Sequence, residues 1–372
     1  MKSLRLISRI IVGLVFIFSG IVKAIDPLGT VYKFQDYFQA FHLPFLKSLS
    51  LLFAILLCTA EFIAGFSVLL NIRPKQGIWL VVLLMAVFTP LTFVLALTNP
   101  VSDCGCFGDA VHLTNWQTFF KNLILLIPVV WLFITRKSEP RDSNPLKNWI
   151  MIAIAAVFFN FFIFYNFRYL PVIDFLPYKV GVSIPDAMKI PEGSKPDKYN
   201  STFIYSKDGI KKEFSLENYP AGDTSWKFVE QKSVLVEKGY QPPIHDFSIT
   251  TEFGEDLTDR ILESEQPVLL MICRKLETAD KEQLRQLVNH GYWCMGNAVT
   301  SFVLTSSPST EVRKYSNGMK FCYTDETTLK TMMRANIGYI LLKKGKIEGK
   351  WSWASIPPFK ELHGIIFNHN IN

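Results

Sequence analysis

Long apolar runs alternate with short polar connections over the first half of the chain, and this pattern predicts membrane-spanning helices. Each run is close to the length that crosses about 30 Å of hydrocarbon. The five runs cover approximately residues 6–22, 49–72, 77–97, 116–135 and 149–167. Beyond residue 169 the apolar runs are shorter and the periodicity changes, so a different kind of structure is expected there.

The first run can be interpreted in two ways, because Lys2, Arg5 and Arg9 precede or enter it. Such cations open either a signal peptide or a first spanning helix. The following residues 21–24 offer a poor small-residue cleavage site, and further spans follow. We therefore expect a retained helix.

Positive charges fall at alternate connections between the predicted spans. The positive-inside rule assigns such connections to the cytoplasm. They carry Lys2, Arg5, Arg9, Arg73, Lys75, Arg136, Lys137, Arg141 and Lys147. The other connections, residues 23–47 and the loop near residue 105, then face outward, as does everything beyond residue 169. This predicts a multi-pass protein of the inner (cytoplasmic) membrane with an extracytoplasmic C-terminal part.

The outward loop between the third and fourth runs contains two cysteines one residue apart, Cys104 and Cys106. A disulfide between them would close a very small ring, and strain of that kind makes a disulfide easier to reduce. Gly105 has no side chain to oppose the bend. The alternative is that each cysteine pairs elsewhere or packs as a small apolar residue. The outward location favours redox chemistry, because disulfides persist there.

Glu61 is an ionisable residue within the second apolar run. Such residues are costly in a membrane and usually face a bundle interior or a functional site. Cys58 and Gly65 share its helix face. Glu61 either handles a proton in a pocket or is paired with a neighbouring helix, with Cys58 as a packing residue and Gly65 permitting close helix approach. We favour the proton-handling role for Glu61 and packing for Cys58.

Composition limits the classes of protein that fit. The chain has 372 residues, is 49% hydrophobic and carries a formal net charge of +7. Near the N-terminus the cations gather at the ends of apolar runs instead of forming a basic face, so nucleic acid is not an expected partner. The six cysteines include no zinc-type CxxC pair and no CxxCH for haem.

A resemblance to a known family follows from these residues. Residues 18–27 with Arg9, then Glu61 with Gly65, and then the Cys104–Gly108 element resemble the DoxX/MauE family of four-helix membrane proteins over about residues 1–136. Members similar to MauE are associated with methylamine utilisation, where such a protein is thought to help form disulfides beside a thioredoxin-like companion. The resemblance implies a function in thiol–disulfide chemistry.

The second half divides into an irregular segment and an alternating one. Residues 170–243 are rich in proline and contain strand-like runs at 202–205 and 233–236. After them, strands and helices alternate and end in a hairpin and a helix, which predicts an α/β layer fold. Strands are expected at 267–273, 298–305, 319–323, 339–344 and 346–353, and helices at 280–290, 311–316, 327–335 and 358–367.

This order resembles thioredoxin over about residues 246–367. The family's CxxC would fall at residues 277–280 and its cis-proline at Ile337, and neither is present. Cys273 and Cys322 lie in or end apolar strands, so burial is expected for both. Cys294 is expected in a loop as the more exposed thiol.

The predicted architecture is an α-helical membrane bundle followed by an extracytoplasmic α/β domain. Its parts are a DoxX/MauE-like four-helix domain (1–136), a cytoplasmic loop with a fifth spanning helix (137–170), a strand-rich linker (171–245) and a thioredoxin-like domain lacking CxxC (246–372).

The predicted function is that of a membrane redox accessory protein in which Cys104 and Cys106 exchange disulfides with an extracytoplasmic client protein. A quinone in the lipid is the natural electron acceptor, with Glu61 handling the proton, although no residue identifies a quinone. The alternative is a non-enzymatic anchor or assembly factor that binds a client through its C-terminal domain. A transporter fits least, because Glu61 is nearly the only charge near the membrane midplane.

Overall fold

The computed structural model describes residues 2–101, 103–138, 144–195, 198–207, 210–215, 225–237, 239–316 and 318–368. Within them, five helical stretches are long and apolar enough to cross a membrane, as predicted. Four of them are the helices α1 (Lys2–Ile25), α4 (Pro74–Thr98), α5 (Asn115–Thr135) and α6 (Pro145–Tyr169). The remaining stretch, Pro44–Leu70, consists of the 3₁₀ turn η1 (Pro44–Leu49) followed by the helix α3 (Ser50–Leu70). The chain is a multi-pass membrane protein.

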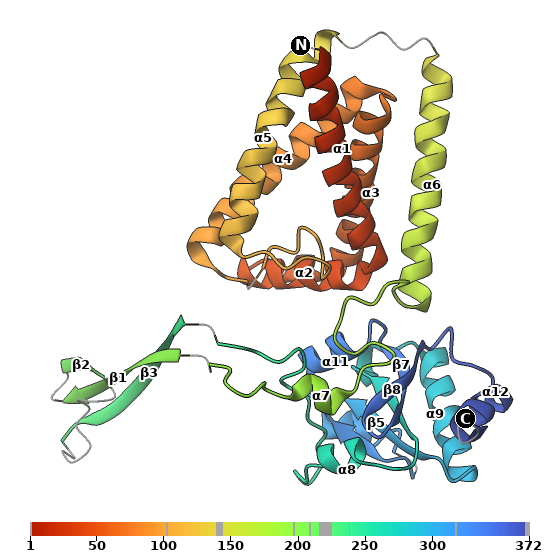
Figure 1. Cartoon of the computed structure of the whole chain (residues 1–372). Coiled ribbons are helices and arrows are strands. Elements are labelled where there is room, and N and C mark those ends of the chain that lie inside the picture. Colours follow the sequence, from red (N-terminus) through yellow and green to blue (C-terminus); the bar gives the residue numbers. More distant parts are fainter. Residues whose placement is uncertain are drawn as a thin grey trace.

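One further helix, α2 (Pro27–Ala40), lies across the end of the bundle (Figure 1). This helix was not predicted from the sequence, where the stretch was expected to be only a connection. The helix begins immediately after α1 because the Asp26 side chain accepts a hydrogen bond from the backbone of Gly29 at 2.8 Å. Pro27, whose fixed φ suits the first helical position, supports the same start. α2 lies between the spanning helices and the C-terminal half.

α1 and α3 pack closely because glycines line their contact. A Cβ atom added to Gly65 would lie 2.7 Å from the carbonyl oxygen of Gly13 and 2.7 Å from the backbone nitrogen of Ile17. Small residues permit this backbone approach in membrane helices. α6 packs on the other side of α3, where the rings of Phe62 and Phe159 stack at 4.0 Å between centroids.

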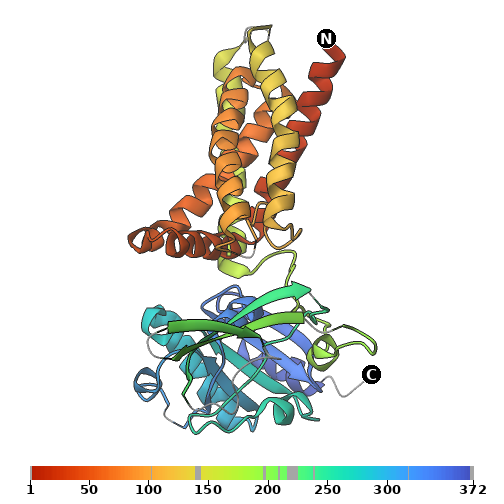
Figure 2. The same cartoon turned by 90° about the vertical axis from the view of Figure 1, so that its left-hand side faces the viewer.

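A three-stranded antiparallel sheet follows α6 and the short helix α7 (Ile184–Met188). Its strands are β1 (Lys198–Lys207), β2 (Ile210–Ser215) and β3 (Lys227–Glu237), in the order β2-β1-β3. The strand-like runs predicted at 202–205 and 233–236 lie within β1 and β3. The sheet projects away from the rest of the chain in Figure 1, and in the turned view of Figure 2 it lies in front of the α/β domain.

The C-terminal part is an α/β domain built on one mixed sheet of order β6-β5-β4-β7-β8. β5 pairs parallel with β4 and β6, while β7 pairs antiparallel with β4 and β8. The strands are β4 (Val268–Cys273), β5 (Thr300–Thr305), β6 (Phe321–Tyr323), β7 (Ile337–Lys343) and β8 (Lys346–Ser352), all near their predicted positions.

Helices cover both faces of this sheet. Alternate residues of β4 point to opposite sides, and because those residues are apolar on both sides, each face needs a covering layer. Leu270 and Ile272 belong to the hydrophobic cluster formed with α7, α8 (Thr258–Leu262) and α11 (Glu326–Met332). Leu269 and Met271 belong to the cluster formed with α9 (Lys281–Gly296), α10 (Ser309–Val312) and α12 (Phe359–Asn368).

The α/β domain lies against the end of the bundle that carries α2 (Figure 1). Lys350 on β8 forms a 2.6 Å ion pair with Asp174, which follows α6. The hydroxyl of Ser352 donates to the backbone carbonyl of Arg168 at 3.1 Å. These contacts attach the domain to the end of α6, and the contacts described below attach it to α2 and to the cysteine loop.

Candidate functional site

The two cysteines of the α4–α5 loop are adjacent free thiols. Their sulfur atoms lie 2.9 Å apart. Gly105 between them has φ +64°, a conformation that favours glycine, and its backbone N–H donates to Asp103 Oδ1 at 2.8 Å. A second turn is closed by the hydrogen bond from Gly108 N to Gly105 O at 3.1 Å. Cys104 and Cys106 are thus brought together by two glycine-dependent turns.

The loop is held by side chains from α1 and α2. Lys23 Nζ donates to the carbonyl oxygen of Cys106 at 2.6 Å. The hydroxyl of Tyr37 donates to the carbonyl oxygen of Cys104 at 2.5 Å. Lys33 forms a 2.7 Å ion pair with Asp103. The backbone around both thiols is therefore fixed from the side of the bundle.

Glu61 is paired with Lys23 inside the bundle. Lys23 Nζ lies 2.8 Å from Glu61 Oε2 and 2.7 Å from Ser19 Oγ, and the residues Lys23 and Glu61 are only 4% and 1% exposed. The Ser19 hydroxyl lies 3.0 Å from Glu61 Oε2 and 2.8 Å from the Cys106 carbonyl, and it can donate to either. A buried ion pair is stable only when such hydrogen bonds are satisfied. This network links Glu61 to the thiol loop.

The environment shifts the pKa values of the two thiols in opposite directions. The adjacent Cys104 thiol, followed by the charges of Lys121 and Lys23, lowers the pKa of Cys106 to about 6, although burial acts in the opposite direction. The contact with Cys106 raises the pKa of Cys104 well above its usual range, and burial adds to this effect. Cys106 is thus the thiolate of the reduced pair, and Cys104 is the protonated partner. Thiolates, not thiols, are the reactive form of cysteine.

A cavity of about 450 Å³ lies beneath the loop and is lined by residues of α1 to α5. Most of its wall is apolar, but Lys23, Glu61, Cys104 and Cys106 line its polar part. On the side between α3 and α4, the wall residues Leu56 and Leu83 are exposed on the lipid-facing surface. The thiols therefore border a space of the size and polarity that accepts a small, largely apolar molecule.

A second groove of about 730 Å³ runs between α1 and α5. It shares Val15, Phe107, Lys121 and Leu125 with the first cavity. Lys121 Nζ lies over the Phe107 ring, 4.3 Å from its centroid. The region around Phe107 and Lys121 thus connects two apolar spaces on different sides of the bundle.

The remaining four cysteines are all buried free thiols. Cys58 is fully buried in the packing of α1, α3 and α6, as predicted. Burial raises the pKa of Cys273 to about 12 and that of Cys322 to about 11. The prediction that Cys294 is an exposed loop thiol is wrong, because α9 continues to Gly296 and turns Cys294 inward, where it is fully buried. The buried positions Leu284, Leu287 and Cys294 have helical spacing, which is the signal that the sequence offered.

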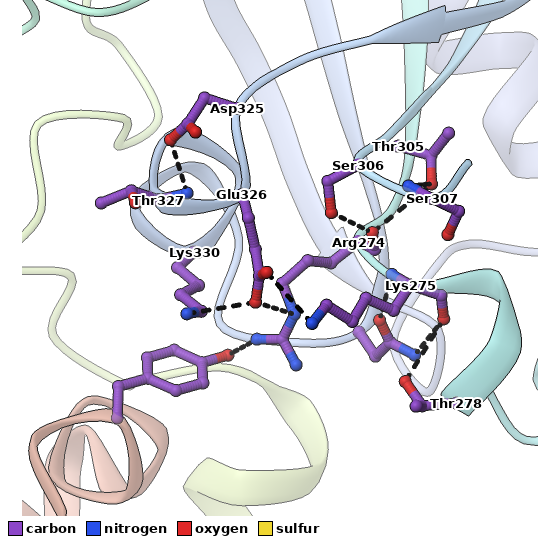
Figure 3. A network of polar contacts seen from close by, with 12 residues as sticks. Arg274, Lys275, Thr278, Thr305, Ser306, Ser307, Asp325, Glu326, Thr327 and Lys330 are labelled. Carbon is purple, nitrogen blue, oxygen red and sulfur yellow. Dashed lines mark hydrogen bonds and ion pairs between the residues drawn. The ribbon is translucent and has the colours of Figure 1, made fainter. Parts of the chain in front are cut away.

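The α/β domain presents cations to α2 beside the thiol loop. Arg274, which follows β4, donates to the hydroxyl of Tyr32 on α2. Arg274, Lys330 and Arg334 lie 5.1, 5.3 and 5.4 Å from the centroid of the Tyr32 ring. Figure 3 shows Glu326 among Arg274, Lys275 and Lys330, which it pairs and holds in place. The aromatic face of Tyr32 thus accepts three cations of the domain.

The sequence pointed to Cys104, Cys106 and Glu61 but did not reveal the role of the residues that connect them, although Ser19 and Lys23 lie within residues 18–27, which carry the family resemblance. Lys23 and Ser19 are four residues apart, a spacing that puts both side chains on one face of α1. This spacing was a signal for a shared role. Tyr37 and Tyr32 were missed because α2 was not recognised as a helix.

Two stretches of the chain are similar to known protein families. Residues 1–135 match the family described as methylamine utilisation protein MauE, and residues 199–238 match a domain of unknown function, DUF8463. The chain is therefore a multi-pass membrane protein whose N-terminal part is similar to this family. It is 31% identical over 153 residues to Protein TlpB of Flavobacterium psychrophilum, which is 40% of this chain and 41% of that protein. The match thus spans less than half of this curated relative. No solved structure matches the chain.

Proposed function

We propose that this protein is a membrane thiol–disulfide oxidoreductase that oxidises or matures a client protein through Cys104 and Cys106. The observation that carries the proposal is the adjacent thiol pair, with sulfurs 2.9 Å apart, beside a buried charged network and an apolar cavity. The match of residues 1–135 to MauE supports a membrane redox or maturation role. The first step uses a disulfide between the two cysteines.

In this step a client thiolate attacks the sulfur of Cys104, and the bond to Cys106 breaks. Cys106 leaves as a thiolate, because a thiol with a low pKa is the better leaving group. A second client thiol then attacks the mixed disulfide and releases Cys104 as a thiol. The client has gained a disulfide, and the two electrons now reside on Cys104 and Cys106.

A quinone fits the cavity by the chemistry of its lining, which combines apolar walls with the ammonium groups of Lys23 and Lys121 and the carboxylate of Glu61. When bound there, a quinone would accept two electrons and two protons. Ser19 and Lys23 keep Glu61 hydrogen-bonded next to the Cys106 backbone, so Glu61 Oε2 is placed to receive or release a proton. The apolar walls exclude water from this part of the site.

The orientation of the site follows from charge. Arg73 stacks on Trp149 and Arg136 on Trp79, and these residues mark the end of the bundle away from the thiol loop. By the positive-inside rule, these cations support an extracytoplasmic location for the loop and the α/β domain. The order and layers of the five-stranded sheet support a thioredoxin-like interpretation of the domain, without the family's exposed cysteine pair.

Thiol trapping in intact membranes tests the proposal. Cys104 and Cys106 should be found oxidised without added reductant and reduced after it. In Cys106→Ser, Cys104 can still attack the disulfide of an oxidised client in the reverse direction, and the resulting mixed disulfide should accumulate because Cys106 is absent and cannot displace the client from it. Cys58→Ala, a change of a buried packing cysteine in the same bundle, is the matched control. A client that remains fully oxidised in the Cys104→Ser/Cys106→Ser double variant would exclude thiol exchange by this pair.

A second function, a non-enzymatic anchor or assembly factor, is favoured by one observation. Cys273, Cys294 and Cys322 are all buried, so this domain offers no accessible thiol in the described part of the chain. Such a factor would bind its client through the α/β domain. Serine substitutions at Cys104 and Cys106 would then be silent, while removal of the domain from residue 246 onward would abolish function.

A further inference from the structure

The α/β domain places one buried arginine between two carboxylates of the membrane bundle. Arg334, just after α11, lies 2.7 Å from Asp26 Oδ2 through Nε and 2.6 Å from Asp109 Oδ2 through Nη2. Its Nη1 atom donates to the carbonyl oxygen of Lys330 at 2.7 Å, which fixes the guanidinium on its own domain. The planar fork of a guanidinium is suited to holding two carboxylates in a fixed geometry.

The two carboxylates belong to the two segments that form the thiol site. Asp26 is the residue between α1 and α2, three positions after Lys23. Asp109 lies three positions after Cys106. Inside the bundle the same segments meet where Lys23 Nζ donates to the carbonyl oxygen of Cys106. The Lys23–Cys106 contact and the Arg334 bridge therefore join one pair of segments at two points.

We propose that Arg334 is a positioning residue of the thiol site, so that docking of the α/β domain completes the active arrangement of the CxC loop. Arg334 touches neither sulfur. It acts through Asp109 on the turn that follows Cys106 and through Asp26 on the helix end that carries Lys23. The role in catalysis rests on the proposed thiol exchange, whereas the positioning effect can be measured on the thiols alone.

Burial makes the bridge sensitive to its partners. Arg334 is 6% exposed and Asp26 is 5% exposed. Removing one member of a buried charge cluster leaves the others without compensation. With a neutral residue at position 334, no cation would separate the carboxylates of Asp26 and Asp109. Asp109 should then move away from Asp26, and the turn that follows Cys106 should move with it.

The test measures the alkylation rate of Cys106 in reduced, full-length protein in membranes, from about pH 5 to about pH 9, the range of cysteine pKa values in proteins. Tandem mass spectrometry distinguishes alkylation of Cys106 from alkylation of Cys104.

The charged or titratable groups that act on Cys106 come from four elements besides its own loop. They are Lys23 on α1, Tyr37 on α2, Glu61 on α3, Lys121 on α5, and Cys104 within the loop.

The Arg334→Gln variant should raise the midpoint of Cys106 alkylation by about one pH unit or more, because a released loop loses its alignment with Lys23 and Lys121. Asp109→Asn, on the other side of the bridge, should give the same shift, and the double variant should shift it no further than either single change. Arg334→Lys keeps the charge but loses the fork, so its shift should be smaller. Arg313→Gln, which removes an exposed arginine paired with Glu252 on the same domain, should leave the midpoint unchanged.

An unchanged midpoint in both Arg334→Gln and Asp109→Asn would overturn the positioning role, even if both proteins are less stable. Additive shifts in the double variant would also contradict it, because the two residues would then act independently. The measurement needs neither client nor electron acceptor. Failure of the proposed thiol exchange therefore appears in the trapping experiment on the client and not in this midpoint.

Discussion

The ammonium group of Lys23 lies 2.8 Å from Oε2 of Glu61 and 2.6 Å from the carbonyl oxygen of Cys106, so one cation joins the buried carboxylate to the thiol loop. Without this contact, Glu61 would be an isolated charge among apolar helices. With it, the charge of Glu61 and the position of Cys106 depend on each other.

The first prediction concerns stability. Lys23→Met should lower the free energy of unfolding by about 3–5 kcal/mol, because it leaves Glu61 buried without its cation. Glu61→Gln should also destabilise, since the ammonium loses its anion. The Lys23→Met/Glu61→Gln double variant should recover most of the loss, because neither charge remains. Thermal unfolding in detergent or lipid measures all three. Equal losses in the single and double variants would contradict a stabilising pair.

The second prediction concerns the redox cycle of the same residues. The double variant Lys23→Met/Glu61→Gln should remain folded but fail to return Cys104 and Cys106 to the disulfide after a reductant pulse, because no group is left to handle the proton. Thiol trapping after removal of the reductant reads this directly. A normal rate of reoxidation would reduce Glu61 to a structural role.

The third prediction is a pH dependence. The Cys106 thiol has its pKa lowered to about 6, so its thiolate is present above that pH and is lost as the pH falls through it. Alkylation of Cys106 should therefore be nearly constant above neutral pH and decline in acid. Cys104→Ser removes the largest cause and should move the midpoint upward. Lys121→Met should move it upward by less. A midpoint in either variant equal to that of the parent protein would contradict these causes.

The sequence indicated much of the bundle because each spanning helix contains its own evidence, a run of apolar residues of membrane length. It identified Glu61 for the same reason, since a charge within such a run is costly. Lys23 was not identified, because a lysine at the end of an apolar run usually reaches water. Only the close approach of α1 and α3 buries it, and that approach depends on residues far apart in the sequence, such as Gly13 and Gly65.

In the C-terminal half, too, features that depend on residues far apart in the sequence were not predicted. The buried strands were found from short apolar runs, but the length of α9 was underestimated, and Cys294 was therefore misplaced. The bridge from Arg334 to Asp26 and Asp109 could not be predicted from the sequence, because it joins residues 308 and 225 positions apart. Nothing local distinguishes Arg334 from an ordinary surface arginine.

The fourth prediction concerns membrane orientation. In a Cys104→Ser/Cys106→Ser background, Phe253→Cys should react with a membrane-impermeant maleimide in intact cells whose outer membrane, if present, is permeabilised. Phe253 is 94% exposed on the α/β domain. Lys137→Cys, at the opposite end of the bundle, is the matched control and should react only after lysis. The reverse pattern would place the thiol loop in the cytoplasm and contradict the proposed redox role.

The last prediction concerns the helix contact that makes the site possible. Gly65→Ala places a Cβ atom 2.7 Å from backbone atoms of α1, a distance that real Cβ contacts essentially never show, so α1 and α3 must separate. Lys23 and Glu61 extend from these same helices, so separating α1 from α3 should lengthen their 2.8 Å contact.

Gly65→Ala should therefore lower the unfolding temperature and also slow the reoxidation of Cys104 and Cys106. Gly296→Ala, at a helical glycine where an added Cβ meets no atom within 4 Å, is the control and should change neither. Thermal unfolding and thiol trapping on the same membrane preparations compare the two effects. A Gly65→Ala protein that is destabilised but reoxidises its thiols at the parent rate would show that the α1–α3 contact supports the fold alone, and would separate the Lys23–Glu61 pair from the chemistry of the cysteines.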